Sequence, residues 1–125
     1  MAPDVRQALG KTGEDLACAE LRRRGYAILA RRYRTRLGEL DIVAREGDTL
    51  VFVEVKARAT LRFGNPGEAV GWRKQRQLVL MARDFLARSC LWRVPCRFDV
   101  VAVLVPQDGA APRVEVYPAA FRVGG

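Results

Sequence analysis

The sequence contains no histidine and little cysteine, two residue types on which many enzyme sites depend. Without an imidazole the chain cannot build a Ser-His-Asp or Cys-His hydrolase, a histidine-based ribonuclease or most zinc centres. Cys18, Cys90 and Cys96 are odd in number and lack a CxxC spacing. We therefore expect reduced, mostly buried thiols and neither a disulfide framework nor a zinc site. Such thiols are typical of a reducing compartment.

Long apolar runs are also missing. The apolar segments have the length of strands, and no basic-then-apolar leader opens the chain. We therefore expect neither a transmembrane helix nor a signal peptide, and hence a cytoplasmic location without membrane association. With 125 residues, of which 50% are hydrophobic and 29% charged, the chain is expected to form one globular domain. Its core should lie between about residues 12 and 117.

Acidic residues are outnumbered by basic ones, 14 against 22, which gives a net charge of +8. This balance favours an acidic partner, and nucleic acid is the expected one. A basic protein without any acidic partner is the alternative. Only Lys11, Lys56 and Lys74 of the basic residues are lysine. Because lysine is a compact donor whose pKa its surroundings can shift, a lysine kept in so arginine-rich a chain is a candidate functional residue.

The segment from Gly38 to Arg58 carries the most informative pattern. Apolar and β-branched residues flank a short break at residues 46–48, which predicts two strands and a tight turn. Alternate side chains of a strand point to opposite faces. Glu54 and Lys56 therefore share the face that begins with Leu50 and Phe52, so two charges lie on a face that starts as core.

If the turn has an even number of residues, Asp41 lies directly across from Glu54. Carboxylates on Cβ atoms about 5 Å apart repel by roughly 3 kcal/mol at an effective dielectric of about 20. A strand propensity scale of about 1 kcal/mol cannot offset this repulsion. We therefore expect a positive group between them, namely a divalent metal, Lys56 or both. Oxygen ligands without sulfur or imidazole suit Mg²⁺ or Mn²⁺. A three-residue turn would separate the two carboxylates and remove the inference.

A first helix is expected to begin with Thr12 as its N-cap and to end at Gly25. Glu14 falls on the apolar stripe that this helix turns toward the sheet. It is either a first-turn acid stabilised by the helix dipole or a third carboxylate of the metal site. Both readings stay open.

A strand over residues 26–33 should follow, and it leads into a run of arginines: Arg31, Arg32, Arg34 and Arg36. The run is either a solvated edge or a rim that contacts phosphates, and we favour the rim because it adjoins the carboxylates. Residues 59–67 are expected to form a Gly/Pro-rich loop. Arg58, just before this loop, and Arg62, within it, are candidates for phosphate contacts.

A second helix is expected from Glu68 to about Cys90. Its core stripe consists of Leu78, Met81, Ala82, Phe85 and Leu86. Lys74 extends this stripe toward the helix start, where it is either a solvated side chain or a phosphate ligand, flanked by Arg73 and Arg76. Strands over 97–105, buried on both faces, and over 113–117 complete the chain.

Asp99 opens the first of these two strands and is expected to form an ion pair with Arg97. A catalytic role for Asp99 is the weaker reading, because an arginine two residues away offers it a partner.

Asp41 together with Glu54-Val55-Lys56 resembles the PD-(D/E)xK nuclease signature, and the expected order of elements is that of the same fold. More specifically, the chain is similar to the YraN-like family of small bacterial predicted endonucleases, which are related to archaeal Holliday-junction resolvases. Arg32 departs from the family, which usually has asparagine there. The matching segments are Gly13-Glu14, Gly38-Glu39-Leu40-Asp41, Phe52 to Lys56 with Arg58, Phe63-Gly64-Asn65-Pro66, Lys74, and Arg97 to Val101.

The resemblance implies an α/β fold with a restriction-endonuclease-like αβββαβ core, in which helices flank a mixed central sheet. It also implies a metal-dependent endonuclease acting on DNA, including branched or junction DNA. Asp41, Glu54 and the Val55 carbonyl would bind Mg²⁺ or Mn²⁺, Lys56 would position the attacking water, and Glu14 would complete the site.

A homodimer is expected if the substrate is a junction, because two sites must then be related by symmetry. One alternative is a non-catalytic nucleic-acid-binding module that retains the fold. Another is a structural protein whose acids are paired with arginines.

Overall fold

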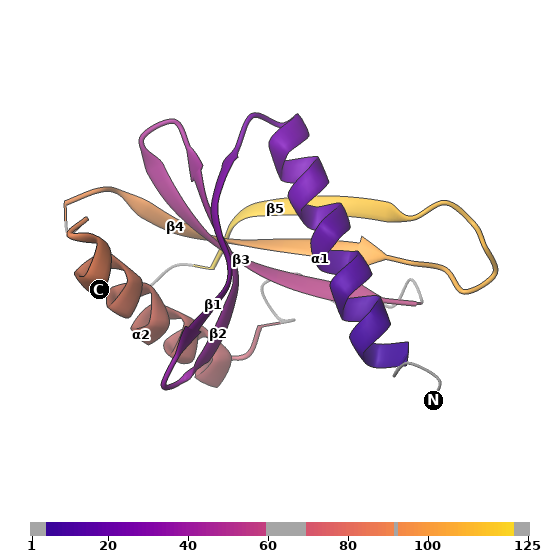
Figure 1. The fold of residues 1–125 in the computed structure, drawn as a ribbon, viewed down its shortest axis with the longest axis horizontal. Coiled ribbons are helices and arrows are strands. Elements are labelled where there is room, and N and C mark those ends of the chain that lie inside the picture. Colours follow the sequence, from indigo (N-terminus) through magenta and orange to yellow (C-terminus); the bar gives the residue numbers. More distant parts are fainter. Residues whose placement is uncertain (1–4, 60–69, 92, 122–125) are drawn as a thin grey trace.

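The computed structural model describes residues 5–59, 70–91 and 93–121, without the side chains of residues 5–9. It has five strands and two helices (Figure 1). They are α1 (Val5–Arg23), β1 (Ala27–Thr35), β2 (Gly38–Glu46), β3 (Thr49–Arg58), α2 (Trp72–Ser89), β4 (Cys96–Leu104) and β5 (Arg113–Phe121). The predicted α/β class is confirmed, because a five-stranded mixed sheet with two helices is consistent with a restriction-endonuclease-like core.

The strand order in the sheet is β1-β2-β3-β4-β5. β3 and β4 run parallel, whereas every other neighbouring pair is antiparallel. Parallel neighbours require a crossover connection, and the segment that contains α2 provides it. This crossover packs α2 back onto β3, where the rings of Phe85 and Phe52 meet edge to face. A helix that follows β3 in the sequence thus lies against it in space.

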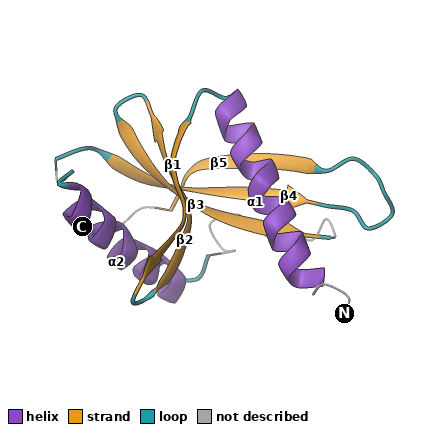
Figure 2. Cartoon of the chain, viewed as in Figure 1, coloured by secondary structure: helices purple, strands orange, loops and turns teal. Residues whose placement is uncertain are grey.

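The two helices cover opposite faces of the sheet (Figure 2). Val51 and Val53 of β3 belong to the buried cluster under α1. Leu50 and Phe52 belong to the cluster under α2. The predicted alternation of β3 is therefore confirmed, and Glu54 continues the face that Phe52 shares with α2.

The core stripe of α2 is also confirmed. Its five predicted residues, Leu78, Met81, Ala82, Phe85 and Leu86, all contribute to the cluster under that helix. β4 is buried along most of its length between β3 and β5, as its apolar sequence predicts.

Three predicted boundaries are wrong. α1 begins at Val5 and not after Thr12, because the helix-forming residues upstream of Thr12 extend the helix. Thr12 therefore lies inside the helix and is not its N-cap. α2 begins at Trp72, because the preceding Gly71 has an extended backbone. β5 continues past Pro118 to Phe121, since Ala119 adopts a positive φ of 49° and its N–H donates to Asp99 Oδ1 at 2.9 Å.

The expectation of mostly buried thiols is wrong as well. All three cysteines are free, but only Cys18 is buried. Cys90 is the left-handed C-cap of α2, and Cys96 is the first residue of β4, so both lie at exposed ends of elements. Neither described helix is long and apolar enough to cross a membrane.

Candidate active site

The two-residue turn Gly47-Asp48 joins β2 to β3, so the even register on which the carboxylate pair depends is confirmed. Continued one residue past the last paired residues, this register places Asp41 opposite Glu54. The Val55 N–H donates to Asp41 Oδ2 at 2.8 Å. The carboxylate thus satisfies a backbone donor of β3 just beyond Ile42 and Val53, the last residues that pair between β2 and β3.

The position of Asp41 also orients the backbone of Val55. The N–H and C=O groups of one strand residue point to the same side of the strand. Since the Val55 N–H points at Asp41, the Val55 carbonyl faces the same side. The two carboxylates and this carbonyl are therefore arranged around the end of the β2–β3 ladder.

Asp41 and Glu54 form a carboxylate pair withdrawn from water. Glu54 is only 6% exposed, and its Oε2 is buried without a hydrogen-bond partner among the described residues. Burial, reinforced by the charge of Glu54, raises the pKa of Asp41 from 3.8 to about 7, although the hydrogen bond from Val55 acts in the opposite direction. An unsatisfied buried acceptor costs about 1–3 kcal/mol, and more when it is charged. Glu54 Oε2 therefore remains without a described partner, a position that a bound cation would fill.

Two lysines approach Glu54 from different elements. Lys56 Nζ lies 3.4 Å and Lys74 Nζ 3.8 Å from Glu54 Oε1. Lys56 lies two residues along the same face of β3, and Lys74 belongs to the first turn of α2. Two of the three lysines of the chain thus converge on one carboxylate oxygen. The side chain of Lys74 is 37% exposed, so the solvated reading and the phosphate-binding reading of this lysine both stay open.

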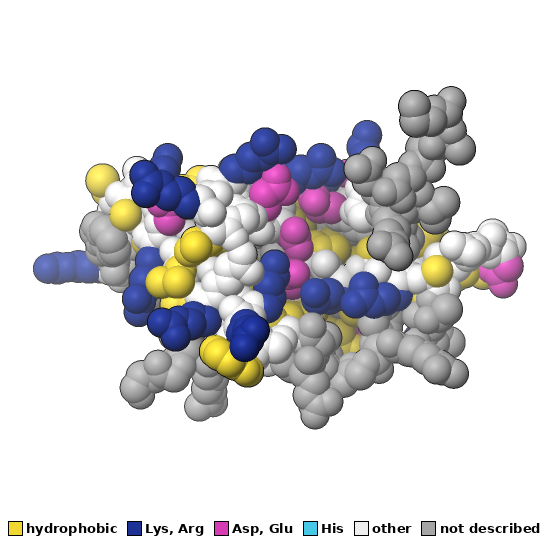
Figure 3. All heavy atoms as spheres, turned by 90° about the horizontal axis from the view of Figure 1, so that it is seen from below, with side chains coloured by type: hydrophobic (Ala, Val, Ile, Leu, Met, Phe, Trp, Pro, Cys, Tyr) yellow, Lys and Arg dark blue, Asp and Glu magenta, His cyan; other side chains and the backbone are white. Residues whose placement is uncertain are grey.

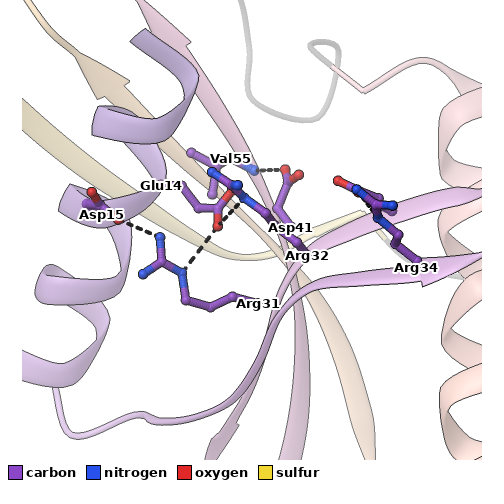
Figure 4. Close-up of polar contacts among 8 residues, drawn as sticks. Glu14, Asp15, Arg31, Arg32, Arg34, Asp41 and Val55 are labelled. Carbon is purple, nitrogen blue, oxygen red and sulfur yellow. Dashed lines mark hydrogen bonds and ion pairs between the residues drawn. The ribbon is translucent and has the colours of Figure 1, made fainter. Parts of the chain in front are cut away.

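Glu14 is held by arginines of β1 (Figure 4). Its Oε1 lies 3.2 Å from Arg31 Nε and 3.4 Å from Arg32 Nε. Arg31 also reaches Asp15 Oδ1 at 2.6 Å. Glu14 belongs to α1 and is buried, and its charge contributes to the raised pKa of Asp41. Among residues 5–59, 70–91 and 93–121, no group of three or more carboxylates or thiols is placed to hold a metal.

An unusual backbone conformation allows two consecutive arginines to reach one carboxylate. In a regular strand Arg31 and Arg32 would point to opposite faces. Arg32 has a positive φ of 53°, which breaks this alternation. The residues paired on either side of it place Arg32 beside Asp41 in the neighbouring strand. Asparagine adopts positive φ more readily than arginine, so Arg32 holds a conformation that its residue type does not favour.

The predicted phosphate-binding residues differ in how they are placed. Arg34 and Arg36 lie exposed at the end of β1, and Arg34 pairs with Glu39 at 2.8 Å. Arg58 is exposed at the end of β3 and donates to the carbonyl of Ala57. Arg73 and Arg76 lie exposed on α2, and Arg62 falls outside the described residues. Figure 3 shows one face on which acidic side chains gather near the centre with basic side chains around them.

A second buried network lies away from the carboxylate pair, and it confirms the predicted pairing of Asp99. Arg97 Nε lies 3.0 Å from Asp99 Oδ1, and the Tyr26 hydroxyl donates to Oδ2 at 3.2 Å. Burial, with the nearby charge of Asp99, raises the pKa of Tyr26 to about 12. Asp99 is fully buried and its oxygens are satisfied, so this network is structural.

Sequence reasoning missed two contacts of the site. The bond between Val55 N–H and Asp41 follows from where the ladder ends, which no local pattern encodes. The arginine partners of Glu14 come from a separate strand. Arg32 was marked as unusual by the family resemblance, but the sequence did not indicate that its side chain would pair with Glu14.

Comparison with known proteins places the chain among close relatives. It matches the model of the uncharacterised protein family UPF0102 over residues 13–103. A UPF0102 protein of Syntrophotalea carbinolica is 51% identical over 120 residues, which is 96% of each chain. One of Rhodococcus opacus is 46% identical over 114 residues, covering 91% of this chain and 96% of the relative. One of Pseudomonas aeruginosa is 43% identical over 113 residues, 90% of each chain.

Proposed function

Because the chain belongs to the uncharacterised protein family UPF0102, the YraN family that its motifs resemble, we infer its function from the site itself. We propose that it is a metal-dependent endonuclease that hydrolyses phosphodiester bonds in DNA. The observation that carries this proposal is the carboxylate pair. Asp41 and Glu54 meet at the end of a ladder, one with a raised pKa and the other with a buried oxygen lacking a described partner.

These residues fit a divalent cation. Asp41 Oδ2 accepts from Val55, which leaves Oδ1 available, and Glu54 Oε2 has no described hydrogen-bond partner. The Val55 carbonyl faces the same side, and all three groups offer the oxygen ligands that Mg²⁺ and Mn²⁺ prefer. When bound, such an ion lowers the pKa of water and neutralises charge on a phosphate.

The lysines then have distinct tasks. Lys56, less exposed and fixed on the sheet beside Glu54, is placed to orient a water molecule or to stabilise negative charge that develops on the phosphate. Lys74 is 37% exposed at its side chain, so it can hold a substrate phosphate while remaining near Glu54. The exposed side chains of Arg34, Arg36 and Arg73 would contact phosphates of the DNA backbone on either side of the cleaved bond.

A nucleic-acid-binding module without catalysis is the second candidate. It is favoured by the state of Glu14, whose charge is offset by Arg31 and Arg32, so that it is not free to act as a third metal ligand. The net charge of +8 supports both candidates equally.

The deciding experiment is cleavage of a labelled panel of linear duplex, single-stranded, flap and four-way-junction DNA with Mg²⁺, Mn²⁺ or EDTA. Wild type is compared with Lys56→Ala and with Lys11→Ala, which removes an exposed lysine of α1 as a matched control. We expect metal-dependent cutting that falls by about 100-fold or more in Lys56→Ala and persists in Lys11→Ala. Binding without cutting under every metal would refute the nuclease and leave the binding module.

Cutting of the four-way junction in particular would call for a homodimer, because two symmetric incisions need two sites. Sedimentation of the protein with and without the junction would then show a two-subunit species.

A further inference from the structure

One aromatic side chain at the start of α2 is left largely open to solvent. Trp72, the first residue of α2, is 68% exposed. Among the residues that the structure describes, the other exposed large apolar side chains are Leu29, Leu37 and Leu80, which are 39–46% exposed. Single exposed apolar residues are common on proteins, but tryptophan usually buries much of its large ring. An indole left this open offers a flat apolar surface to something outside the chain.

The surroundings of Trp72 select the kind of partner. The guanidinium of Arg73 lies 5.4 Å from the centre of the indole ring, which makes a cation-π contact. The first turn of α2 contains Arg73 and Lys74 and no acid. The helix as a whole has five basic residues and one acidic residue, a net +4 out of the +8 of the chain. An apolar protein surface would be a poor match for so many cations, whereas nucleic acid offers flat bases and phosphates together.

Trp72 begins the helix that brings Lys74 to the carboxylate site, although side chains two residues apart on a helix do not face each other. Lys74, two residues along the helix and therefore about 3 Å further along its axis, reaches Glu54 at 3.8 Å. A DNA strand that places a phosphate at Lys74 would carry its neighbouring bases past the start of α2.

We propose that Trp72 is a stacking platform for an unpaired base, so that the substrate is DNA with a single-stranded segment next to the site. This inference rests on the proposed function and adds its substrate class. Bases inside a duplex are stacked on both faces and cannot cover an indole, whereas an unpaired base can. Fully paired linear DNA would meet only the cations.

The size of the effect follows from stacking energies. Replacing an aromatic side chain that stacks on a base with alanine weakens binding by about 1–3 kcal/mol. Because each 1.4 kcal/mol is a tenfold change in affinity, this loss corresponds to about 5- to 150-fold. We expect a loss in this range for Trp72→Ala on DNA with an unpaired segment, and a change of less than about twofold on duplex, where phosphate contacts dominate.

The test measures binding in EDTA, so that no DNA is cut. The two ligands are a duplex and the same duplex with a short single-stranded flap, carrying 2-aminopurine at the first unpaired position as a fluorescent reporter of stacking. Trp72→Ala, Trp72→Phe and Leu80→Ala are compared with wild type. Trp72→Phe retains a ring, and Leu80→Ala removes another exposed apolar side chain of the same helix. Far-UV circular dichroism establishes that all variants are folded.

The expected result is a flap preference with 2-aminopurine quenching in wild type, lost in Trp72→Ala, largely kept in Trp72→Phe and unchanged in Leu80→Ala. An intact flap preference in Trp72→Ala would overturn the inference. An equal loss on both ligands would also overturn it, as would a loss of self-association in Trp72→Ala, which would mark a second copy as the occupant.

Failure of the proposed function is read separately. The same samples are given Mn²⁺ and scored for cutting. A flap preference through Trp72 without any cutting would refute the nuclease and keep the stacking platform. Cutting without that preference would keep the nuclease and refute the stacking platform.

Discussion

Replacing Asp41 with asparagine is expected to stabilise the metal-free protein at neutral and alkaline pH. In the folded protein Asp41 holds its proton up to about pH 7, whereas an ordinary aspartate loses it near 3.8. Between these values the folded state binds more protons than the unfolded state, so the free energy of unfolding falls as pH rises through this window. Asparagine retains an oxygen that can accept from the Val55 N–H, but it carries no charge.

The magnitude follows from the two pKa values. At 1.36 kcal/mol per unit, the shift from 3.8 to about 7 corresponds to about 4 kcal/mol over the whole window. Of this, about 3 kcal/mol falls between about pH 5 and pH 8. At about 4 °C per kcal/mol for a chain of this size, the variant should gain roughly 10 °C in Tm over wild type as pH rises.

The assay is urea and thermal unfolding in EDTA, followed by far-UV circular dichroism, for wild type, Asp41→Asn and Asp48→Asn. Asp48 lies exposed in the turn of the same hairpin, so its variant should track wild type at every pH. A difference between Asp41→Asn and wild type that stays constant from about pH 5 to 8 would refute the reasoning. Adding Mn²⁺ at about 100 times its Kd should stabilise wild type by about 2.7 kcal/mol at pH 8 and leave Asp41→Asn unchanged.

Two further predictions concern packing and the structural network. A Cβ added at Gly13 would meet the Ala57 Cβ at 2.6 Å, so Gly13→Ala should destabilise by about 1–3 kcal/mol despite the helix preference of alanine. Ala57→Gly should recover part of this loss in a double-mutant cycle, and strictly additive effects would show that the contact is absent. Asp99→Ala should cost about 3–5 kcal/mol in urea unfolding, because it removes the buried carboxylate that pairs with Arg97 and accepts from Tyr26 and Ala119. Glu20→Ala, at an ion pair on the surface of α1, should change little, and equal losses would contradict a buried network.

The fold and the centre of the site were predictable because they depend on local rules. A strand alternates strictly, so Glu54 could be assigned to the face of Phe52 without knowledge of what covers that face. A two-residue turn fixes the register of its hairpin, and this alone placed Asp41 opposite Glu54. The rarity of lysine identified Lys56 and Lys74, and both reach Glu54.

What the sequence did not predict depends on contacts between distant segments or on weak local preferences. Thr12, with an acid three residues later, has a frequent capping pattern, yet the pattern has no effect when the residues before it continue the helix. The strand predicted over residues 113–117 extends to Phe121, past a positive φ at Ala119. The arginines on Glu14 required the conformation of Arg32, which is unfavourable for its residue type.

The parallel pairing of β3 and β4 has a consequence for the order in which the protein acquires its site. β1, β2 and β3 follow one another as a meander with short connections, and such local contacts form quickly. α2 and β4 join only after the longer crossover closes, at a larger entropic cost. Asp41 and Glu54 should therefore come together early, without Lys74. A nascent chain would carry a carboxylate pair before it carries the lysine of α2, and pulse-labelled hydrogen exchange should protect amides of β2 before those of β4. On the proposed function, the contact of Lys74 with a substrate phosphate would then be available only in chains that have finished folding.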